Sequence, residues 1–269
     1  MVKTILITGS TDGIGLETAK ALVALGHTVW IHGRSQAKLV AAQAQLLKIP
    51  NAGVVKTFKA DLSIASEVDA LADHVVAQQS KLDVLINNAG VFKVPQPKTE
   101  GALDVRFAVN TLAPFQLTKR LLSHMASNGR VVNLSSAAQA AVDLKALEGK
   151  VWLDDNQAYA QSKLALTMWS FHLAQTLAAT GPSILAVNPA SFLGSKMVKE
   201  AYGVAGNDLQ IGVDILVRAS LSDAFANVSG RYYDNDAQQF AEPHPDALNT
   251  QKNAQVVHVI ETLLASKKG

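Results

Sequence analysis

The chain has 269 residues, of which 48% are hydrophobic and 17% charged, and its formal net charge is +2. This composition provides enough apolar surface for a large core and too little charge for a disordered chain. The absence of cysteine excludes disulfides and thiolate chemistry, and the seven histidines lack any spacing typical of metal ligands. The basic residues are scattered, so we expect neither a nucleic-acid partner nor a metal site.

The beginning of the chain, Met1 to Ile5, leads directly into a predicted strand and has no signal-peptide pattern. No apolar run approaches the roughly 20 residues that a membrane helix needs. We therefore expect a soluble, cytoplasmic protein with no membrane span.

An apolar run from Val2 to Thr8 is typical of a strand that is buried on both faces. It leads into a glycine-rich turn, after which a helical pattern covers residues 16–25. Such a turn lets backbone N–H groups and a helix N-terminus face a pyrophosphate, although a purely structural turn is the alternative. The residues expected to contact a dinucleotide here are Gly9, Ser10, Gly13, Ile14 and Gly15.

The second predicted strand covers Thr28 to His32, and the residues at its end distinguish between NADP(H) and NAD(H) as the bound dinucleotide. The chain continues into Gly33, Arg34 and Ser35 and offers no acidic residue for the adenosine ribose. Because an arginine suits a 2′-phosphate, Arg34 and Ser35 favour NADP(H) over NAD(H). The alternative is a solvated arginine at the start of the helix predicted at residues 36–48, where a cation is electrostatically unfavourable.

Two further strand ends supply candidates for the same cofactor, after the strands predicted at residues 54–59 and 82–86. The Asp61 carboxylate could meet an adenine amine or cap the next helix. After the strand at residues 82–86, asparagine amides tie neighbouring loops together, and the small residues that follow them allow close approach of a flat ligand. The candidates at these two ends are Asp61, Leu62, Asn88, Ala89 and Gly90.

A long helix is predicted from Gly101 to Met125, with Pro114 in its interior. Proline cannot donate to the carbonyl four residues back, which belongs to Asn110. We therefore expect a kinked helix, in which a water is the natural partner of that carbonyl.

The fifth predicted strand, Val131 to Leu134, ends in Ser135 and Ser136. Open α/β sheets bind ligands at the carboxyl ends of their strands, so these serines could contact a substrate; otherwise they cap a turn. The polar stretch that follows, residues 137–157, is predicted to be irregular.

Tyr159 and Lys163 lie four residues apart in a helix predicted to run to about Ala179, and therefore share one helix face. A phenol has a reference pKa of about 10. An ammonium ~4 Å away at an effective dielectric of about 20 would stabilise the phenolate by about 4 kcal/mol, or roughly three pKa units. The pair could thus transfer a proton near neutrality, although a half-buried ring beside a solvated amine is the alternative.

Strands and helices continue to alternate in the remainder of the chain. A sixth strand (183–187) ends in Asn188 and Pro189, residues 191–208 are predicted to be a mobile segment, and a helix (209–225), a short strand (230–233) and a final helix (253–265) follow. This alternation predicts an α/β fold, a single Rossmann-type doubly wound parallel sheet with helices on both faces. We expect one domain over residues 1–269.

With these motifs in place, the chain resembles the short-chain dehydrogenase/reductase family over essentially its full length. The extra length at residues 137–157 and the sequence at 229–233 are similar to its retinol-dehydrogenase-like and protochlorophyllide-reductase-like members. The matching residues are Thr8-Gly9, Gly13-Ile14-Gly15, Asp61, Asn87-Asn88-Ala89-Gly90, Asn110, Asn133-Leu134-Ser135-Ser136, Tyr159 to Lys163 and Asn188-Pro189.

The resemblance implies roles for five of these residues. Tyr159 is the catalytic acid/base, and Lys163 lowers its pKa and holds the nicotinamide ribose. Ser136, the second serine of the pair, hydrogen-bonds the substrate oxygen, and the carbonyl of Asn110 holds a water linked to the lysine. Pro189 lies at the cofactor, and family members often form homodimers or homotetramers.

Three positions depart from the family's pattern. Ala190 stands where most members have a glycine after Pro189, and the expected downstream threonine is displaced to Ser195, which leaves the contact with the nicotinamide amide open. Asp12 stands where NADP-preferring members often carry a basic residue, which weakens the argument from Arg34.

We therefore predict an NADP(H)-dependent oxidoreductase that interconverts an alcohol and a carbonyl on a small hydrophobic molecule. The substrate pocket would be built from residues 91–99, 137–157 and 191–208, which are largely apolar. Two alternatives stay open: reduction of a conjugated carbon–carbon double bond by the same residues, and a cofactor-binding regulator without turnover.

Overall fold

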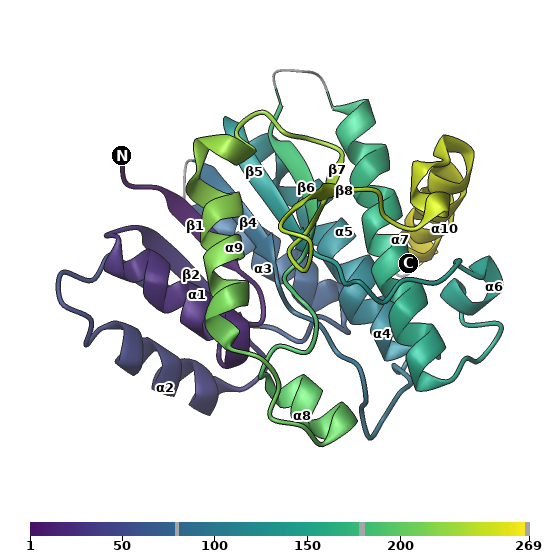
Figure 1. Cartoon of the computed structure of the whole chain (residues 1–269), viewed down its shortest axis with the longest axis horizontal. Coiled ribbons are helices and arrows are strands. Elements are labelled where there is room, and N and C mark those ends of the chain that lie inside the picture. The colour runs from purple at the N-terminus through teal and green to yellow at the C-terminus, as the bar shows by residue number, and fades with distance from the viewer. Residues whose placement is uncertain (79–80, 178–180, 267–269) are drawn as a thin grey trace.

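Eight strands form one sheet in the order β3-β2-β1-β4-β5-β6-β7-β8 within residues 1–78, 81–177 and 181–266, the part of the chain that the computed structural model describes (Figure 1). The strands are β1 (Thr4–Ile7), β2 (Thr28–Gly33), β3 (Val55–Lys59), β4 (Leu82–Asn87), β5 (Met125–Leu134), β6 (Ser183–Asn188), β7 (Arg231–Asp234) and β8 (Gln239–Ala241). All neighbouring pairs are parallel except β7 and β8. The strand order reverses between β1 and β4, and this switch point is where ligands bind in open α/β sheets.

The predicted doubly wound parallel sheet is confirmed, and it carries one additional antiparallel edge strand, β8. It pairs with β7 through the register Tyr233 to Phe240, and a short turn connects the two strands. A strand of three residues is too short to show a hydrophobic period, so the sequence pattern could not reveal it.

Alternate residues of the parallel strands enter two separate cores, one on each face of the sheet. Ile5 and Ile7 of β1 pack under α1, α2 and α9, whereas Leu6 packs on the opposite face with α3, α5, α7 and α10. Both faces are therefore covered, as the continuous apolar runs predicted. The helices are α1 (Gly13–Ala24), α2 (Gln36–Leu46), α3 (Ala65–Gln78), α4 (Val105–Phe107), α5 (Ala113–Leu121), α6 (Leu144–Leu147), α7 (Asp155–Thr176), α8 (Lys196–Tyr202), α9 (Leu209–Leu221) and α10 (Thr250–Ser266), with a π-helical turn η1 (Ala108–Leu112) and 3-10 turns η2 (Leu122–His124), η3 (Asp223–Phe225) and η4 (Pro245–Leu248).

The helix predicted from Gly101 to Met125 is wrong at both ends and differs in its middle. It begins at Val105, after Asp104 caps it, and Met125 is already the first residue of β5. The π-helical turn η1 precedes Pro114, which then occupies the first turn of α5. Proline is tolerated in a first turn, and the π-helical turn before it is a local widening of the helix; the expected kink stays a prediction.

Two segments contain short helices that the sequence analysis did not predict. The stretch 137–157 contains α6, and Asp154 caps α7 so that this helix begins before Tyr159. The segment 191–208 contains α8; its mobility stays a prediction. The predicted helix end at Ala179 lies outside the described residues.

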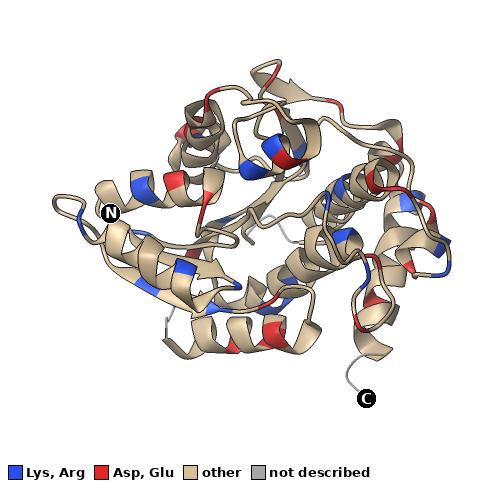
Figure 2. Ribbon diagram, turned by 90° about the horizontal axis from the view of Figure 1, so that it is seen from below, with Lys and Arg blue, Asp and Glu red and all other residues tan. Residues whose placement is uncertain are grey.

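Charged side chains are spread over the helices, and Figure 2 shows basic and acidic residues interspersed. Among the described residues, every helix is either too short or too polar to cross a membrane.

Candidate active site

The glycine-rich turn is packed tightly against the loop that follows β4. A Cβ on Gly9 would lie 2.8 Å from Cα of Ala89, and a Cβ on Gly15 would lie 2.5 Å from Nδ2 of Asn88. The Asn88 amide donates to the carbonyls of Thr8 and Gly9, both at 2.9 Å. Glycine is thus required here for close approach of two backbones, and Asn88 ties the loops together as predicted.

His32 braces the same turn from β2, and the sequence analysis missed it. Its Nδ1 accepts a hydrogen bond from the Gly9 N–H at 3.0 Å, and its Nε2 lies 3.0 Å from the carbonyl of Ala60. This arrangement requires a neutral ring with the proton on Nε2. Burial accordingly lowers the pKa of His32 to about 4. The available signal was a histidine at the carboxyl end of an apolar strand, next to a glycine-rich turn.

Ser10 lies in the scaffold, in contrast to its predicted contact with the nucleotide. Its hydroxyl is fully buried, donates to the carbonyl of Ile7 at 2.8 Å and accepts from the His32 N–H at 2.9 Å. Both hydrogen-bonding functions of the side chain are therefore used inside the protein.

A cleft of about 790 Å³ runs along the carboxyl ends of the parallel strands. Most residues predicted to bind the cofactor line it, and Phe92 comes from the segment 91–99 predicted for the substrate pocket. Thr11, His32 and Lys38 also line the cleft and were not predicted as site residues. The predicted residues in its wall are Gly9, Gly13, Ile14, Gly15, Arg34, Ser35, Asp61, Leu62, Asn88, Ala89, Gly90, Tyr159, Lys163 and Pro189.

One end of the cleft carries two cations beside two carboxylates. Nη1 of Arg34 lies 3.9 Å from Asp61, and Nζ of Lys38 lies 2.7 Å from Asp12; all four side chains are at least partly exposed. The Asp61 carboxylate also accepts from Ser63, so it stabilises the turn before α3 while it borders the cleft. Exposed pairs of this kind contribute little to stability, which leaves the cations available for an anionic ligand.

Lys163 lies at the end of the cleft opposite to Arg34 and Lys38, and its side chain is almost completely buried. Its Nζ donates to the carbonyl of Leu134, the last residue of β5, at 2.7 Å. Burial lowers the pKa of Lys163 to about 8. A Cβ on Gly90 would lie 3.5 Å from both this Nζ and Oδ1 of Asn110, so the loop after β4, α7 and η1 converge at this point.

Asn110 uses its side chain to connect these elements. Its Oδ1 accepts from the Val91 N–H at 2.8 Å, and its Nδ2 donates to the Val91 carbonyl at 2.9 Å and to the Ser162 hydroxyl at 3.0 Å. The amide therefore joins the loop after β4 to the helix that carries Tyr159 and Lys163.

Tyr159 is half-buried, and its ring packs on Phe92 with centroids 4.7 Å apart. Burial raises the pKa of Tyr159, a hydrogen bond with Ser136 lowers it, and the neighbouring Tyr202 raises it, with a net increase. This differs from the expected lowering by Lys163. The physical reason is that Nζ of Lys163 turns toward β5 and lies 5.8 Å from the centre of the phenol ring.

The two serines after β5 have different surroundings. Ser135 is buried and shares a hydrogen bond of 2.7 Å with Thr167. Ser136 is partly exposed on the Tyr159 side, and its carbonyl accepts from the Tyr232 hydroxyl at 3.2 Å and from Gln139 at 2.9 Å. Ser135 is the serine in the wall of the cleft, whereas Ser136 is hydrogen-bonded to Tyr159, so the choice of Ser136 as the substrate contact stays a prediction.

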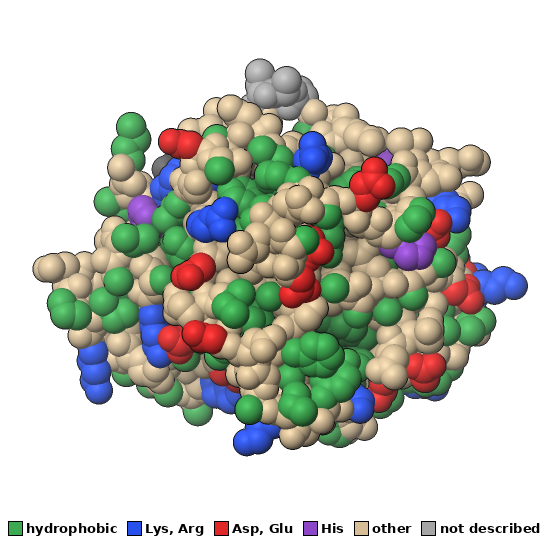
Figure 3. Space-filling model, in the orientation of Figure 1, with side chains coloured by type: hydrophobic (Ala, Val, Ile, Leu, Met, Phe, Trp, Pro, Cys, Tyr) green, Lys and Arg blue, Asp and Glu red, His purple; other side chains and the backbone are tan. Residues whose placement is uncertain are grey.

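Aromatic side chains from two segments cover the Tyr159 end of the cleft. The Phe92 ring lies 5.9 Å from that of Tyr202 on α8, which in turn lies 5.3 Å from that of Phe192. Figure 3 shows apolar side chains gathered where α8 lies in Figure 1, and Phe192 and Tyr202 are about half exposed. These rings make this part of the entrance apolar, and the charged residues Lys93, Lys196 and Glu200 line the cleft beside it. Among the described residues, no cluster of histidines and carboxylates could hold a metal ion.

Comparison with known proteins agrees with this geometry. The sequence model of the family described as short chain dehydrogenase matches residues 3–203. The chain belongs to the short-chain dehydrogenase/reductase family. Within it, the chain falls among the retinol-dehydrogenase-like members, which confirms the predicted resemblance, and it is an NAD(P)-dependent oxidoreductase.

Individual relatives in this family are moderately similar. Retinol dehydrogenase 12 of Bos taurus is 31% identical over 90% of this chain and 80% of its own length. Polyprenol dehydrogenase of Homo sapiens is 35% identical over 67% of this chain and 57% of its own length. The structure of angucycline C-6 ketoreductase LanV with bound NADP is 26% identical, with a TM-score of 0.70, over 87% of this chain and 93% of its own.

Proposed function

We propose that this protein is an NADP(H)-dependent oxidoreductase that interconverts a hydrophobic alcohol and its carbonyl compound. The observation that carries the proposal is that Tyr159 and Lys163 lie at one end of a cleft whose other end presents Arg34 and Lys38. Ser136 is hydrogen-bonded to Tyr159, and Asn110 is hydrogen-bonded to Ser162 of the same helix. The relatives named for retinol and polyprenol and the NADP-bound ketoreductase support the same chemistry.

The residues fit a dinucleotide. Gly9 and Gly15 hold the turn close to Ala89 and Asn88, and a Cβ on Gly13 would meet nothing within 4 Å, so the start of α1 is open to the approach of a pyrophosphate. Lys163 has three donors, of which the Leu134 carbonyl takes one, so two are free for ribose hydroxyls. Arg34 and Lys38 suit a 2′-phosphate, which favours NADP(H).

The bound nicotinamide would supply or accept the hydride. Tyr159 would donate its phenolic proton to the carbonyl oxygen during reduction and take it back during oxidation. Because burial raises the pKa of Tyr159, the phenol is the protonated donor at neutral pH. Ser136 would hold the same oxygen by a hydrogen bond and so fix its distance from the phenol.

The substrate class follows from the entrance. Phe92 packs on the ring of Tyr159, Tyr202 packs on Phe92, and Phe192 packs on Tyr202. Against these rings a polar substrate would lose hydration, whereas an apolar one would be stabilised by burial. We therefore infer a medium or large apolar alcohol, aldehyde or ketone.

The test compares two tyrosine variants at the same site. Tyr159→Phe removes the proposed acid, and we expect kcat for an apolar carbonyl compound to fall by roughly 10²- to 10⁴-fold. The Kd for NADPH should stay within about twofold, since the phenol is not the anchor for the phosphates. Tyr202→Phe removes a hydroxyl near the same ring and serves as the control that retains turnover. Retained turnover in Tyr159→Phe would refute the assignment.

A further inference from the structure

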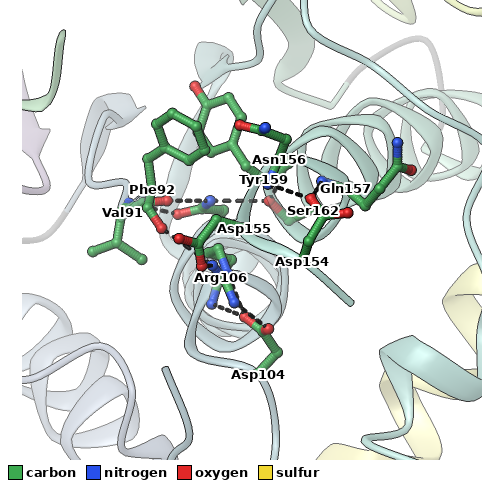
Figure 4. A network of polar contacts seen from close by, with 11 residues as sticks. Val91, Phe92, Asp104, Arg106, Asp154, Asp155, Asn156, Gln157, Tyr159 and Ser162 are labelled. Carbon is green, nitrogen blue, oxygen red and sulfur yellow. Dashed lines mark hydrogen bonds and ion pairs between the residues drawn. The ribbon is translucent and has the colours of Figure 1, made fainter. Parts of the chain in front are cut away.

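Arg106 of α4 is a fully buried charged residue that has no role in the proposed chemistry. Its Nε and Nη2 donate to the two oxygens of Asp104 at 2.7 and 2.6 Å, and its Nη1 donates to Asp155. Nη1 also lies 3.5 Å from the carbonyl of Phe92 (Figure 4). The guanidinium thus contacts two segments that both reach Tyr159.

These two segments flank the phenol from different sides. Asp155 is the first residue of α7, one helical turn before Tyr159. Phe92 packs its ring on the ring of Tyr159. A single guanidinium therefore connects the start of the tyrosine's own helix with the aromatic residue against which the tyrosine rests.

Asn110 joins the same two elements, the loop after β4 and α7, that Arg106 joins. Asn110 follows Arg106 by four residues and binds Val91 on one side and Ser162 of α7 on the other. Both side chains extend from the α4–η1 segment to the loop after β4 and to α7. Two successive cross-links thus hold the loop after β4 against α7, before and after Tyr159.

Stability alone does not explain such a cluster. Taking a guanidinium and its carboxylates out of water costs several kcal/mol per ion, and well-packed apolar residues are often as stable or more stable. Burial alone would lower the pKa of Arg106, but the hydrogen bonds to Asp104 and Asp155 raise it, so the charge is retained. A bidentate guanidinium does provide fixed geometry, which apolar packing does not.

We propose that Arg106 is a positioning residue, which holds the Tyr159 ring in its catalytic orientation by clamping Asp155 and the Phe92 loop together. This inference rests on the proposed function of Tyr159 as the acid. Arg106 itself acts only through these two neighbours, since it is buried away from the cleft wall.

The chain offers a matched pair of variants at the start of α7. Asp155→Asn weakens the clamp, and its partly exposed side chain makes misfolding a small risk. Asp154→Asn removes the same charge one residue earlier, where the carboxylate caps α7 by accepting from Asn156 and Gln157. Both variants lose one negative charge at the helix N-terminus, but only the first changes a contact of Arg106.

We expect Asp155→Asn to lower kcat about tenfold or more, with the Kd for NADPH within about twofold, because a small displacement of the acid is costly in the chemical step. Asp154→Asn should change kcat by less than about twofold even if it lowers Tm, since the cap acts on helix stability. Equal losses of kcat in the two variants, or losses that follow Tm, would overturn the proposal.

A second readout needs no substrate. NMR of protein with isotope-labelled tyrosine, with the Tyr159 signal identified by its loss in Tyr159→Phe, reports the packing of the ring directly. We expect this signal to shift in Asp155→Asn and in Arg106→Lys, which keeps the charge but loses the fork geometry. It should not move in Asp154→Asn. An unshifted signal in Asp155→Asn overturns the clamp, whether or not the wild-type protein reduces any carbonyl compound.

Discussion

Replacement of Lys163 by methionine should make the protein more stable while it removes activity. Burial lowers the pKa of Lys163 from its ordinary 10.5 to about 8, so keeping the amine charged at pH 7 costs the folded state about 3 kcal/mol. Methionine fills a similar volume without this penalty, but it loses the hydrogen bond to the Leu134 carbonyl, which costs about 1 kcal/mol. We expect a net gain of about 2 kcal/mol in the free energy of unfolding at pH 7.

The pH dependence identifies the cause of this gain. The folded-state pKa lies below the unfolded-state value, so the penalty is complete below pH 8 and disappears as the pH rises through 10.5. Urea unfolding of the wild type and Lys163→Met at pH 7 and pH 10 should therefore give a difference that shrinks by about 2 kcal/mol or more. Lys48→Met, at an exposed lysine, is the control that should show no such change. A Lys163→Met protein that is less stable at pH 7, or a difference that does not depend on pH, would refute the reasoning.

Three further predictions follow from the same geometry. The pKa of His32 is lowered to about 4, so on acidification the unfolded state takes up a proton before the folded state does, and the free energy of unfolding should fall by about 3 kcal/mol as the pH drops from 6.5 through 4. Urea unfolding at pH 7 and pH 4 should therefore show a smaller loss of stability in His32→Gln than in the wild type. An equal loss in the two proteins would contradict this prediction. Gly15→Ala places a Cβ 2.5 Å from the Asn88 amide, so calorimetric titration should show NADPH binding weakened by about tenfold or more, and unchanged affinity would argue against the tight turn. Arg34→Ala should weaken NADPH by about tenfold while the Kd for NADH stays unchanged, because only the 2′-phosphate needs the cation; parallel losses for both cofactors would exclude a phosphate contact.

Most of the fold could be predicted because it depends on local signals. The apolar runs of the parallel strands, the glycine-rich turn and the helical periods each indicate one element, and their alternation indicates the sheet. The predictions that failed concern elements that are very short or whose structure depends on contacts with distant parts of the chain. β8 exists only because it pairs with β7, and the π-helical turn before Pro114 is one of several ways in which a helix accommodates a proline.

The site was predictable at the level of residues but less so at the level of contacts. Tyr159, Lys163 and Asn110 converge as expected, yet the direction in which the Lys163 amine points depends on the position of the Leu134 carbonyl. The packing role of Ser10 likewise depends on a partner more than 20 residues away in β2. Arg106 gave no sequence signal, since its contacts join three segments that only the fold brings together.

Hydride transfer to a carbonyl carbon tests the central claim most directly. Wild-type protein would be incubated with NADPH that carries deuterium at the transferable position and with a panel of apolar aldehydes and ketones, retinaldehyde among them, and the products analysed by mass spectrometry and NMR. We predict an alcohol with one deuterium on the carbinol carbon. Deuterium found only on a former double-bond carbon, or no product from any member of the panel, would contradict the assignment of this cleft as the site of alcohol and carbonyl interconversion.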